Sequence, residues 1–200
     1  MKKLTTAFLL LLGCVYNFSQ AQDFPLPTNE TGAIEYTEVV ELADFDKERL
    51  FKNAKGFCES LVPNKKTRKG SFSEDAEAGT VTITNTFKVL KKSVTKQVSG
   101  EIRYDLEIEV KDGKYRYFFK SFAFTPYTRD RYGKFKPMKR ETTVMIPVSK
   151  PLSVGEGLWK KHLESCNNHV TYWIEQLKFE MQRKADEPKK KEKKKEEIQW

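Results

Sequence analysis

The residues best suited to chemistry lie in the segment HLESCNNH near the C-terminus. His162, Cys166 and His169 are four and three residues apart, so a helix would place them on one side. Imidazole nitrogens and a thiolate are common ligands of zinc, and Cys58 could supply a fourth ligand for a tetrahedral site. The same segment brings a thiol close to an imidazole, which is the pairing used in nucleophilic catalysis.

The surrounding pattern favours packing over chemistry. Cys166 falls near the centre of a stripe of apolar residues at helical spacing, and His162 and His169 lie on the border of that stripe. No Gly-rich phosphate loop, nucleophile elbow or metalloprotease motif occurs in the sequence. We therefore expect no catalytic residue, no metal site and no cofactor, and a protein that is not an enzyme.

The state of the two later cysteines is open. An exported protein can form a disulfide between Cys58 and Cys166. Each of them also lies on an apolar helical face, which is typical of a buried free thiol. The sequence does not choose between these alternatives, because spacing along the chain does not fix distance in space.

The N-terminus has the features of a secretory signal. Lys2 and Lys3 precede a short apolar run at 7–12, and small residues follow at Ser19 and Ala21. We predict a signal peptide at 1–21 with cleavage after Ala21. The mature protein would then be periplasmic or secreted.

A lipid anchor is the alternative for this segment. Residues 11–14, LLGC, resemble a bacterial lipobox in which Cys14 would be acylated. The protein would then be exported and held at a membrane through Cys14.

The rest of the sequence indicates one folded domain with a polar segment before it and another after it. Residues 22–33 are rich in Pro, Gly and Thr and indicate a flexible lead. Residues 34–183 are long enough to bury a core without a metal or a disulfide. Residues 184–200 are charged and of low complexity, which is typical of a disordered tail.

Hydrophobic periodicity within this domain predicts an α+β fold. In chain order we expect strands at 34–42, 71–73, 80–90, 100–111, 114–124 and 142–148, a helix from Asp46 to Val62, and a final helix at 157–184. Residues 125–141 are expected to form a long loop. This order is typical of a curved antiparallel sheet of about five to six strands with two helices packed on one face.

The hairpin at 100–124 carries the most specific expectation. Asp112-Gly113 is typical of a two-residue type I′ turn, which would place Lys111 opposite Lys114. In that register Glu109 faces Arg116 and Asp105 faces Lys120, so opposite charges pair across the strands.

Continued without interruption, this register gives the second strand two aromatic faces. Tyr115, Tyr117 and Phe119 would point into the core. Phe118, Phe122 and Phe124 would point the other way, beside Glu107, Arg103 and Glu101. The second set would either be covered by the lead or the 125–141 loop, or form an exposed aromatic patch for a partner.

Cations are concentrated in loops that an antiparallel meander would bring to one end. The formal net charge is +9, and loops 65–69, 91–96 and 129–140 are rich in Lys and Arg. The candidate anion-binding residues are Lys65, Lys66, Arg68, Lys91, Lys92, Arg129, Arg131, Lys134 and Lys136. In an exported protein such an end suits an anionic envelope lipid, an acidic glycan or another envelope protein, and not nucleic acid. Alternatively, the lysines only keep the domain soluble.

Three segments carry a resemblance to a known family: EYTEVVELADFDKERLFKNAKGF (35–57), EDAEAGTV (74–81) and VKDGKYRYFF (110–119). Together they resemble a family of secreted bacterial envelope domains of unknown function with a TBP-like fold. The resemblance covers about residues 34–180 and implies a curved antiparallel sheet gripping a helix. Phe57 stands where a Trp is expected on the first helix. The family brings no catalytic residues that could be carried over.

These observations predict a non-catalytic, exported binding or interaction module of the bacterial cell envelope. The alternative is a carrier of a small apolar ligand, with a cavity between the sheet and the C-terminal helix. A carrier requires an internal apolar cavity, whereas an interaction module requires a filled core and a salt-sensitive surface.

Overall fold

The computed structural model describes residues 26–62, 71–91, 97–147, 150–151 and 153–184, and all structural statements below concern these residues. The predicted signal peptide, the lipobox cysteine Cys14 and all but the first residue of the predicted tail lie outside them. So do four of the candidate cations, which are Lys65, Lys66, Arg68 and Lys92.

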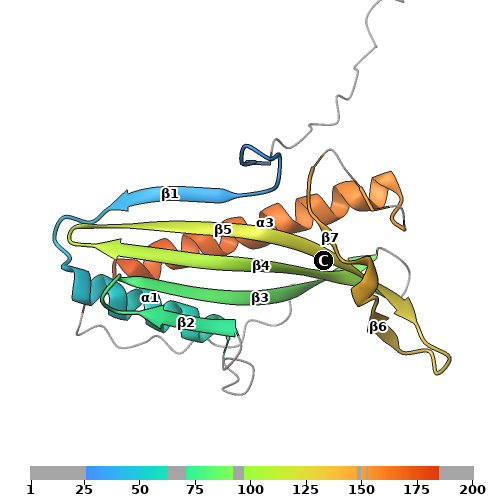
Figure 1. Ribbon diagram of the computed structural model, residues 1–200, viewed down its shortest axis with the longest axis horizontal. Helices are drawn as coiled ribbons and strands as arrows, with labels where there is room; N and C mark the ends of the chain where they lie inside the picture. The colour runs from blue at the N-terminus through green and yellow to red at the C-terminus, as the bar shows by residue number, and fades with distance from the viewer. Residues whose placement is uncertain (1–25, 63–70, 92–96, 148–149, 152, 185–200) are drawn as a thin grey trace, which may run out of the picture.

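The architecture is an antiparallel sheet with helices on one face. The strands are β1 (Tyr36–Glu41), β2 (Phe72–Asp75), β3 (Thr80–Lys91), β4 (Gln97–Lys111), β5 (Lys114–Arg129), β6 (Phe135–Pro137) and β7 (Thr143–Val144). The helices are α1 (Lys47–Leu61) and α3 (Glu156–Met181), with a short 3-10 turn η1 (Lys139–Glu141). The strand order is β1-β5-β4-β3-β2, and β6 and β7 also pair with β5 (Figure 1).

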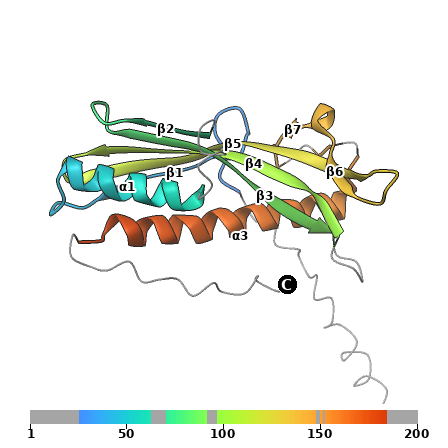
Figure 2. The ribbon, with the colours of Figure 1, turned by 90° about the horizontal axis from the view of Figure 1, so that it is seen from below.

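Both helices lie on the same side of the sheet, as Figure 2 shows. The predicted α+β class and its two helices are confirmed. The sheet has seven strands in place of the five to six expected, because β5 continues through 125–129 and pairs with β6. The prediction of one long loop at 125–141 is therefore wrong. We call the sheet face opposite the helices the outer face.

Helix α1 begins and ends where the sequence predicts. The Asp46 carboxylate accepts a hydrogen bond from the backbone N–H of Arg49 at 2.7 Å, so it satisfies one free donor of the first turn. Val62 is the C-cap and directly precedes Pro63. The face that packs against the core is formed by Leu50, Ala54, Phe57, Cys58 and Leu61. The ring of Phe57 meets Trp173 of α3 edge-on, with 6.1 Å between centroids.

Alternation along β3 and β4 places the core between the sheet and the helices. The buried positions of these strands are Val81, Ile83, Val89, Ile102, Tyr104, Leu106, Ile108 and Val110. Asn85 is the polar residue on this side, and its side-chain amide lies 3.4 Å from both the carbonyl of Leu61 and the hydroxyl of Tyr104. Hydrogen bonding of this kind offsets the cost of placing an amide against a core.

The register of β4 and β5 is as predicted from the turn to Lys120. Lys111 pairs with Lys114 and Leu106 with Phe119. Of the two predicted charge pairs, Glu109 and Arg116 bond directly, with Arg116 Nη2 2.7 Å from Glu109 Oε2. Asp105 lies opposite Lys120 in the ladder, but the Lys120 ammonium pairs with Glu107. The inward-facing residues Tyr115, Tyr117 and Phe119 are all buried.

The Asp112-Gly113 turn differs from the prediction in its type. Gly113 has a φ of +73°, but Asp112 does not have the positive φ that a type I′ turn requires at both central residues. The turn docks on the junction between β1 and α1. The Asp112 carboxylate accepts from the N–H of Lys47 at 2.7 Å, and the N–H of Gly113 donates to the Phe45 carbonyl at 2.9 Å.

The acidic turn after β2 joins the same assembly. Lys47 Nζ donates to the Glu77 carbonyl at 2.6 Å, and the N–H of Val110 donates to the Gly79 carbonyl at 2.8 Å. The three segments that carry the family resemblance therefore meet at one end of the sheet. We call this the turn end.

A β-bulge at Ser121 overturns the predicted second aromatic face. β5 has one extra residue here, so Arg103 pairs with Ala123 and Ile102 with Phe124. Ser121 has a φ of +58°. An extra residue inverts the alternation of every side chain beyond it. Phe122 and Phe124 accordingly turn into the core, where they are 1% and 0% exposed.

Helix α3 confirms the predicted C-terminal helix. Its buried positions are Trp159, His162, Cys166, Val170, Leu177 and Met181. His162 is fully buried, so its expected place on the border of the stripe is wrong. Within the described residues, no helix combines the length and the apolar character that crossing a bilayer requires.

Candidate functional site

The histidines of α3 are packing residues with separate partners. His162 Nε2 lies 3.0 Å from Ser99 Oγ, and burial lowers the pKa of this histidine to about 4. His169 stacks on Phe87 with 3.7 Å between ring centroids and accepts a hydrogen bond from Trp173 Nε1 at 3.1 Å. Burial also lowers the pKa of His169 to about 4. Both rings are therefore neutral at pH 7.

Cys58 and Cys166 are both free and buried in the structure. This is the second of the two alternatives that the sequence left open. Burial raises the pKa of each thiol, so neither is a thiolate nucleophile near neutral pH. Within the part of the chain that the structure describes, no group of His, Cys, Asp or Glu is arranged to hold a metal ion.

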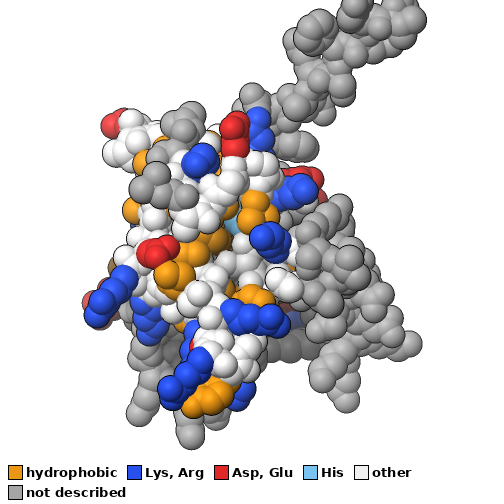
Figure 3. Space-filling model, turned by 90° about the vertical axis from the view of Figure 1, so that its right-hand side faces the viewer, with side chains coloured by type: hydrophobic (Ala, Val, Ile, Leu, Met, Phe, Trp, Pro, Cys, Tyr) orange, Lys and Arg blue, Asp and Glu red, His pale blue; other side chains and the backbone are white. Residues whose placement is uncertain are grey.

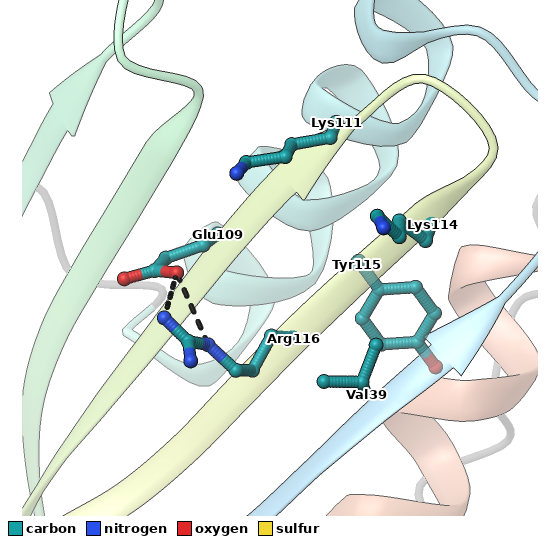
Figure 4. A pocket seen from close by; sticks show the side chains of 6 residues that line it. All are labelled: Val39, Glu109, Lys111, Lys114, Tyr115 and Arg116. Atoms are coloured by element: carbon teal, nitrogen blue, oxygen red, sulfur yellow. Dashed lines mark hydrogen bonds and ion pairs between the residues drawn. The ribbon is translucent and has the colours of Figure 1, made fainter.

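A shallow hollow lies on the outer face near the turn end (Figure 4). Its volume is about 220 Å³, and it is lined by Val39, Glu109, Lys111, Lys114, Tyr115 and Arg116. Glu109 pairs with Arg116, and Glu41 of β1 lies across from Lys114. Because the charges nearly balance and the hollow is open, we assign no ligand to it.

Phe118 is the one member of the predicted aromatic patch that remains on the outer face. Two cations of its own strand lie over its ring, with Arg116 at 4.6 Å and Lys120 at 5.2 Å from the centroid. Lys120 also pairs with Glu107 at 2.6 Å. The ring is half-buried by these side chains, so the predicted exposed aromatic patch of Phe118, Phe122 and Phe124 does not form.

A basic hairpin projects from the opposite end of the sheet. The end of β5 pairs with β6, with Tyr127 opposite Pro137 and Arg129 opposite Phe135. The N–H of Gly133 donates to the Asp130 carbonyl at 2.9 Å, and the N–H of Asp130 donates to the Lys134 carbonyl at 2.8 Å. We call residues 129–137 the basic hairpin and this end of the sheet the hairpin end.

Asp130, the one acidic residue of the basic hairpin, bonds to groups within the hairpin itself. One oxygen of Asp130 accepts from the N–H groups of Tyr132 and Lys134, both at 2.9 Å. The other oxygen pairs with Lys136 at 2.9 Å. Lys136 and these two amides hold the pKa of Asp130 below its usual range. The carboxylate therefore shapes the turn and leaves the nearby cations without a free counter-charge.

The two arginines of the basic hairpin lie close to aromatic rings. The guanidinium of Arg129 lies 5.4 Å from the centroid of Phe135 and donates to the Gly133 carbonyl at 3.1 Å. The guanidinium of Arg131 lies 4.8 Å from the centroid of Tyr132. Tyr132 is 71% exposed at the tip. A charge and a ring are thus presented together to solvent.

The structure brings most of the described candidate cations together. Arg129, Arg131, Lys134 and Lys136 share the basic hairpin, and all are exposed. Lys91 is exposed where β3 ends, at the same end of the sheet. Figure 3 looks onto this end, where Lys and Arg side chains surround smaller apolar areas and few acids are visible.

Of the candidate cations that the structure describes, Lys91 and those of 129–136 lie at one end as the sequence predicts, but the hairpin that holds most of them was not predicted. The available signal was the spacing of Asp130 and Gly133, since a three-residue loop with glycine in the left-handed region commonly joins two strands. Lys139 and Arg140 of the predicted basic loop 129–140 lie exposed in η1 directly after β6.

The chain is similar to one family and to two solved structures. Residues 36–125 match a family described as a domain of unknown function (DUF4468) with TBP-like fold. A TBP-like protein from Parabacteroides distasonis is 16% identical, with a TM-score of 0.59 over 78% of this chain and 97% of that chain. A DUF4468 family protein from Bacteroides ovatus is 10% identical, with a TM-score of 0.50 over 82% and 94%. No curated protein matches the chain.

At these identities the two structures establish the fold. The matched range 36–125 includes α1, the turn end and the Ser121 bulge. The basic hairpin begins after this range ends.

Proposed function

We propose that this chain, whose residues 36–125 form a DUF4468 domain with the TBP-like fold, is a non-catalytic binding module exported to the bacterial cell envelope. Its contact surface is the basic hairpin, and its partner is anionic. The observation that carries this proposal is the charge of the hairpin. Residues 129–137 contain four cations and a single acid, and that acid is already bound within the turn.

Several features support a binding role over catalysis. The histidines and cysteines that could do chemistry are neutral and packed into the core. Export is supported by the basic, apolar and small-residue pattern of residues 1–21. An anionic partner is supported by the exposed Arg and Lys at one end, which would attract opposite charge over roughly 10 Å at moderate salt.

Nucleic acid is disfavoured by the charge of the open sheet face. Proteins that read nucleic acid with a sheet lay strands against the phosphate-lined grooves. Here the outer face of β4 carries Glu101, Asp105, Glu107 and Glu109. These carboxylates alternate with cations such as Arg103, and Glu107 and Glu109 pair with Lys120 and Arg116. The face therefore presents no continuous cationic track for a phosphate backbone.

The alternative of an apolar-ligand carrier requires space between the sheet and α3. In the described part of the chain, packed rings occupy this layer. Tyr104 lies 5.7 Å from Phe119 and 5.8 Å from Phe122, centroid to centroid, and Cys166 and Val170 of α3 are fully buried above the sheet. These contacts favour a filled core and therefore an interaction surface.

Site-specific photo-crosslinking in cells tests the contact surface. A crosslinking side chain at position 132 should give partner adducts that weaken as salt is raised in the isolated envelope fraction. The same side chain at Thr86, which is exposed on the outer face, is the matched control. Adducts from position 86 with none from position 132 would contradict the proposal.

Intact-mass measurement of the protein from its envelope fraction tests export. Cleavage after Ala21 predicts a chain that begins at Gln22, whereas acylation at Cys14 predicts a longer, lipid-modified chain. A chain that keeps Met1 and is recovered only in the cytoplasm would contradict export.

A further inference from the structure

We infer that the anionic partner of the basic hairpin is a phospholipid surface, which the tip contacts with Tyr132 at the level of the headgroups. This inference rests on the proposed binding role and adds the class of partner. Three observations carry it: the shape of the hairpin, the state of its charges and the position of its one open aromatic ring.

The hairpin is a projection and not a pocket. Figures 1 and 2 show β6 and the end of β5 extending beyond the rest of the sheet. A small soluble anion is usually bound in a concavity that encloses it. A convex tip instead suits a broad surface that it can approach end-on.

The tip is held in one shape before any contact. The hydrogen bonds from Gly133 to Asp130 and from Asp130 to Lys134, and the two bonds that the Asp130 carboxylate accepts, tie the turn together. A preformed tip loses little conformational freedom on binding. Its geometry is therefore available to a partner without rearrangement.

Two cations of the hairpin tip can bind an anion without first breaking an ion pair. Lys136 is paired with Asp130, but Arg131 and Lys134 have no carboxylate partner among the described residues. A cation close to an anionic membrane surface changes binding by roughly fivefold. Arg131 and Lys134 can contribute this attraction without first breaking an ion pair.

Tyr132 supplies the second component of interfacial binding. It lies between these two cations and is 71% exposed, with the Arg131 guanidinium 4.8 Å from its ring centroid. Tyrosine is enriched at membrane–water interfaces because its ring is apolar and its hydroxyl is wet. The ring and the two charges would therefore reach the headgroup region together.

Vesicle co-sedimentation of the full mature protein tests this inference. Vesicles of phosphatidylglycerol and phosphatidylcholine should bind the protein in a salt-sensitive manner, and phosphatidylcholine alone should bind it weakly. The double variant Arg131→Glu/Lys134→Glu should lose about 25-fold or more in affinity, from two contacts of roughly fivefold each. Tyr132→Ser should give a smaller loss that persists at high salt.

The matched control is Lys111→Glu/Lys114→Glu at the turn end. It makes the same change in net charge at two exposed positions of another hairpin. The charged C-terminal tail is present in every variant, so it cannot account for a difference between them. Circular dichroism and thermal unfolding of both double variants confirm that each is folded.

An equal loss of affinity in both double variants would overturn the inference, because net charge alone would then explain binding. Binding to a soluble acidic polysaccharide without binding to anionic vesicles would also overturn it. In that case crosslinks from position 132 would still support the proposed function. Absence of both crosslinks and vesicle binding would contradict both the inference and the proposed function.

Discussion

The two ends of the sheet are built from similar parts, a tight hairpin with a glycine at positive φ, but they use their polar groups differently. At the turn end, Asp112 and Lys47 are tied to backbone groups of neighbouring segments. At the hairpin end, the one acid is tied to its own turn and the other charges face solvent. Polar groups therefore stabilise the fold at one end and remain available for contact at the other.

The bulge at Ser121 separates these two regions within a single strand. Before it, the cross-strand pattern predicted from the turn holds residue by residue. Beyond it, Phe122 and Phe124 join the core and the strand continues into the basic hairpin. Because of the bulge, one strand contributes aromatic rings to the core on both sides of Ser121. The same strand then continues into the projecting basic hairpin.

Truncation of the two rings that follow the bulge is expected to have the largest effect. Phe122 and Phe124 are 1% and 0% exposed, so the double variant Phe122→Ala/Phe124→Ala would remove both rings from the core. Loss of a buried Phe side chain costs about 3–5 kcal/mol, and loss of two is enough to unfold most domains of this size. Urea unfolding and near-UV circular dichroism would measure the loss of packing.

Ser121→Gly is the control in the same strand. It keeps both rings and the extra residue and relieves the φ of +58°, so the free energy of unfolding should change by no more than about 1 kcal/mol. A folded double variant with native near-UV signals would show that the two rings are dispensable.

Low pH should destabilise the core that lies between the bulge and the hairpin end. His162 lies 5.2 Å from Phe124, and His169 stacks on Phe87, which pairs with Ile102 beyond the bulge. Burial lowers the pKa of both histidines to about 4, compared with an ordinary value of 6.5. Between these values the unfolded chain binds more protons, so the free energy of unfolding falls as pH falls.

Each histidine contributes up to about 3 kcal/mol over this window, since one pKa unit corresponds to about 1.4 kcal/mol. Urea unfolding between pH 6.5 and 5 isolates the histidines from carboxylates such as Glu38, which titrates below its ordinary value of 4.5. His169→Phe should reduce the slope by about one proton. An unchanged slope in that variant would contradict the assignment.

Two glycine substitutions compare the ends directly. Gly79 has a φ of +74°, and an added Cβ would lie 2.7 Å from the Val110 carbonyl oxygen and 2.8 Å from Lys47 Cε. Gly133 has a φ of +78°, but an added Cβ would have its nearest neighbour at 3.9 Å. Both alanine variants carry backbone strain of about 1–2 kcal/mol, and only Gly79→Ala adds a backbone clash.

We therefore expect Gly79→Ala to lower the free energy of unfolding by about 3 kcal/mol and Gly133→Ala by about 1 kcal/mol. Chemical denaturation of the two variants under identical conditions measures the difference. Equal losses would show that the turn end is no more tightly packed than the hairpin end.

The smallest expected effects come from changing exposed charged side chains. Asp112→Ala deprives the Lys47 N–H of its acceptor and should lower the free energy of unfolding by about 1 kcal/mol, as loss of a helix cap does. Arg131→Glu/Lys134→Glu breaks no ion pair among the described residues and should stay within about 0.5 kcal/mol of the parent. Thermal unfolding measures the stability of both variants. A larger loss of stability in Arg131→Glu/Lys134→Glu would show that the charges of the hairpin tip, and not those of the turn end, stabilise the fold.

Local patterns predicted much of the fold and part of the candidate site. The Asp46 cap, the end of α1 at Val62 and the pairing of Lys111 with Lys114 each depend on residues close together in the chain. The position of Lys91 and of the cations of 129–136 at one end followed from alternation of loops. The basic hairpin was missed because β6 is three residues long and gives almost no periodic signal.

Local spacing of apolar residues is enough to predict which faces of α1, β3, β4 and the first half of β5 are buried. The path of β5 beyond Lys120 depends on long-range contacts. The extra residue at Ser121 is retained by contacts from distant segments, since Met145 donates its N–H to the Phe122 carbonyl at 2.9 Å and Ala123 pairs with Val144. Phe124 packs against Trp159 and His162 of α3. No local pattern encodes such contacts, because the residues that make them are more than twenty positions away.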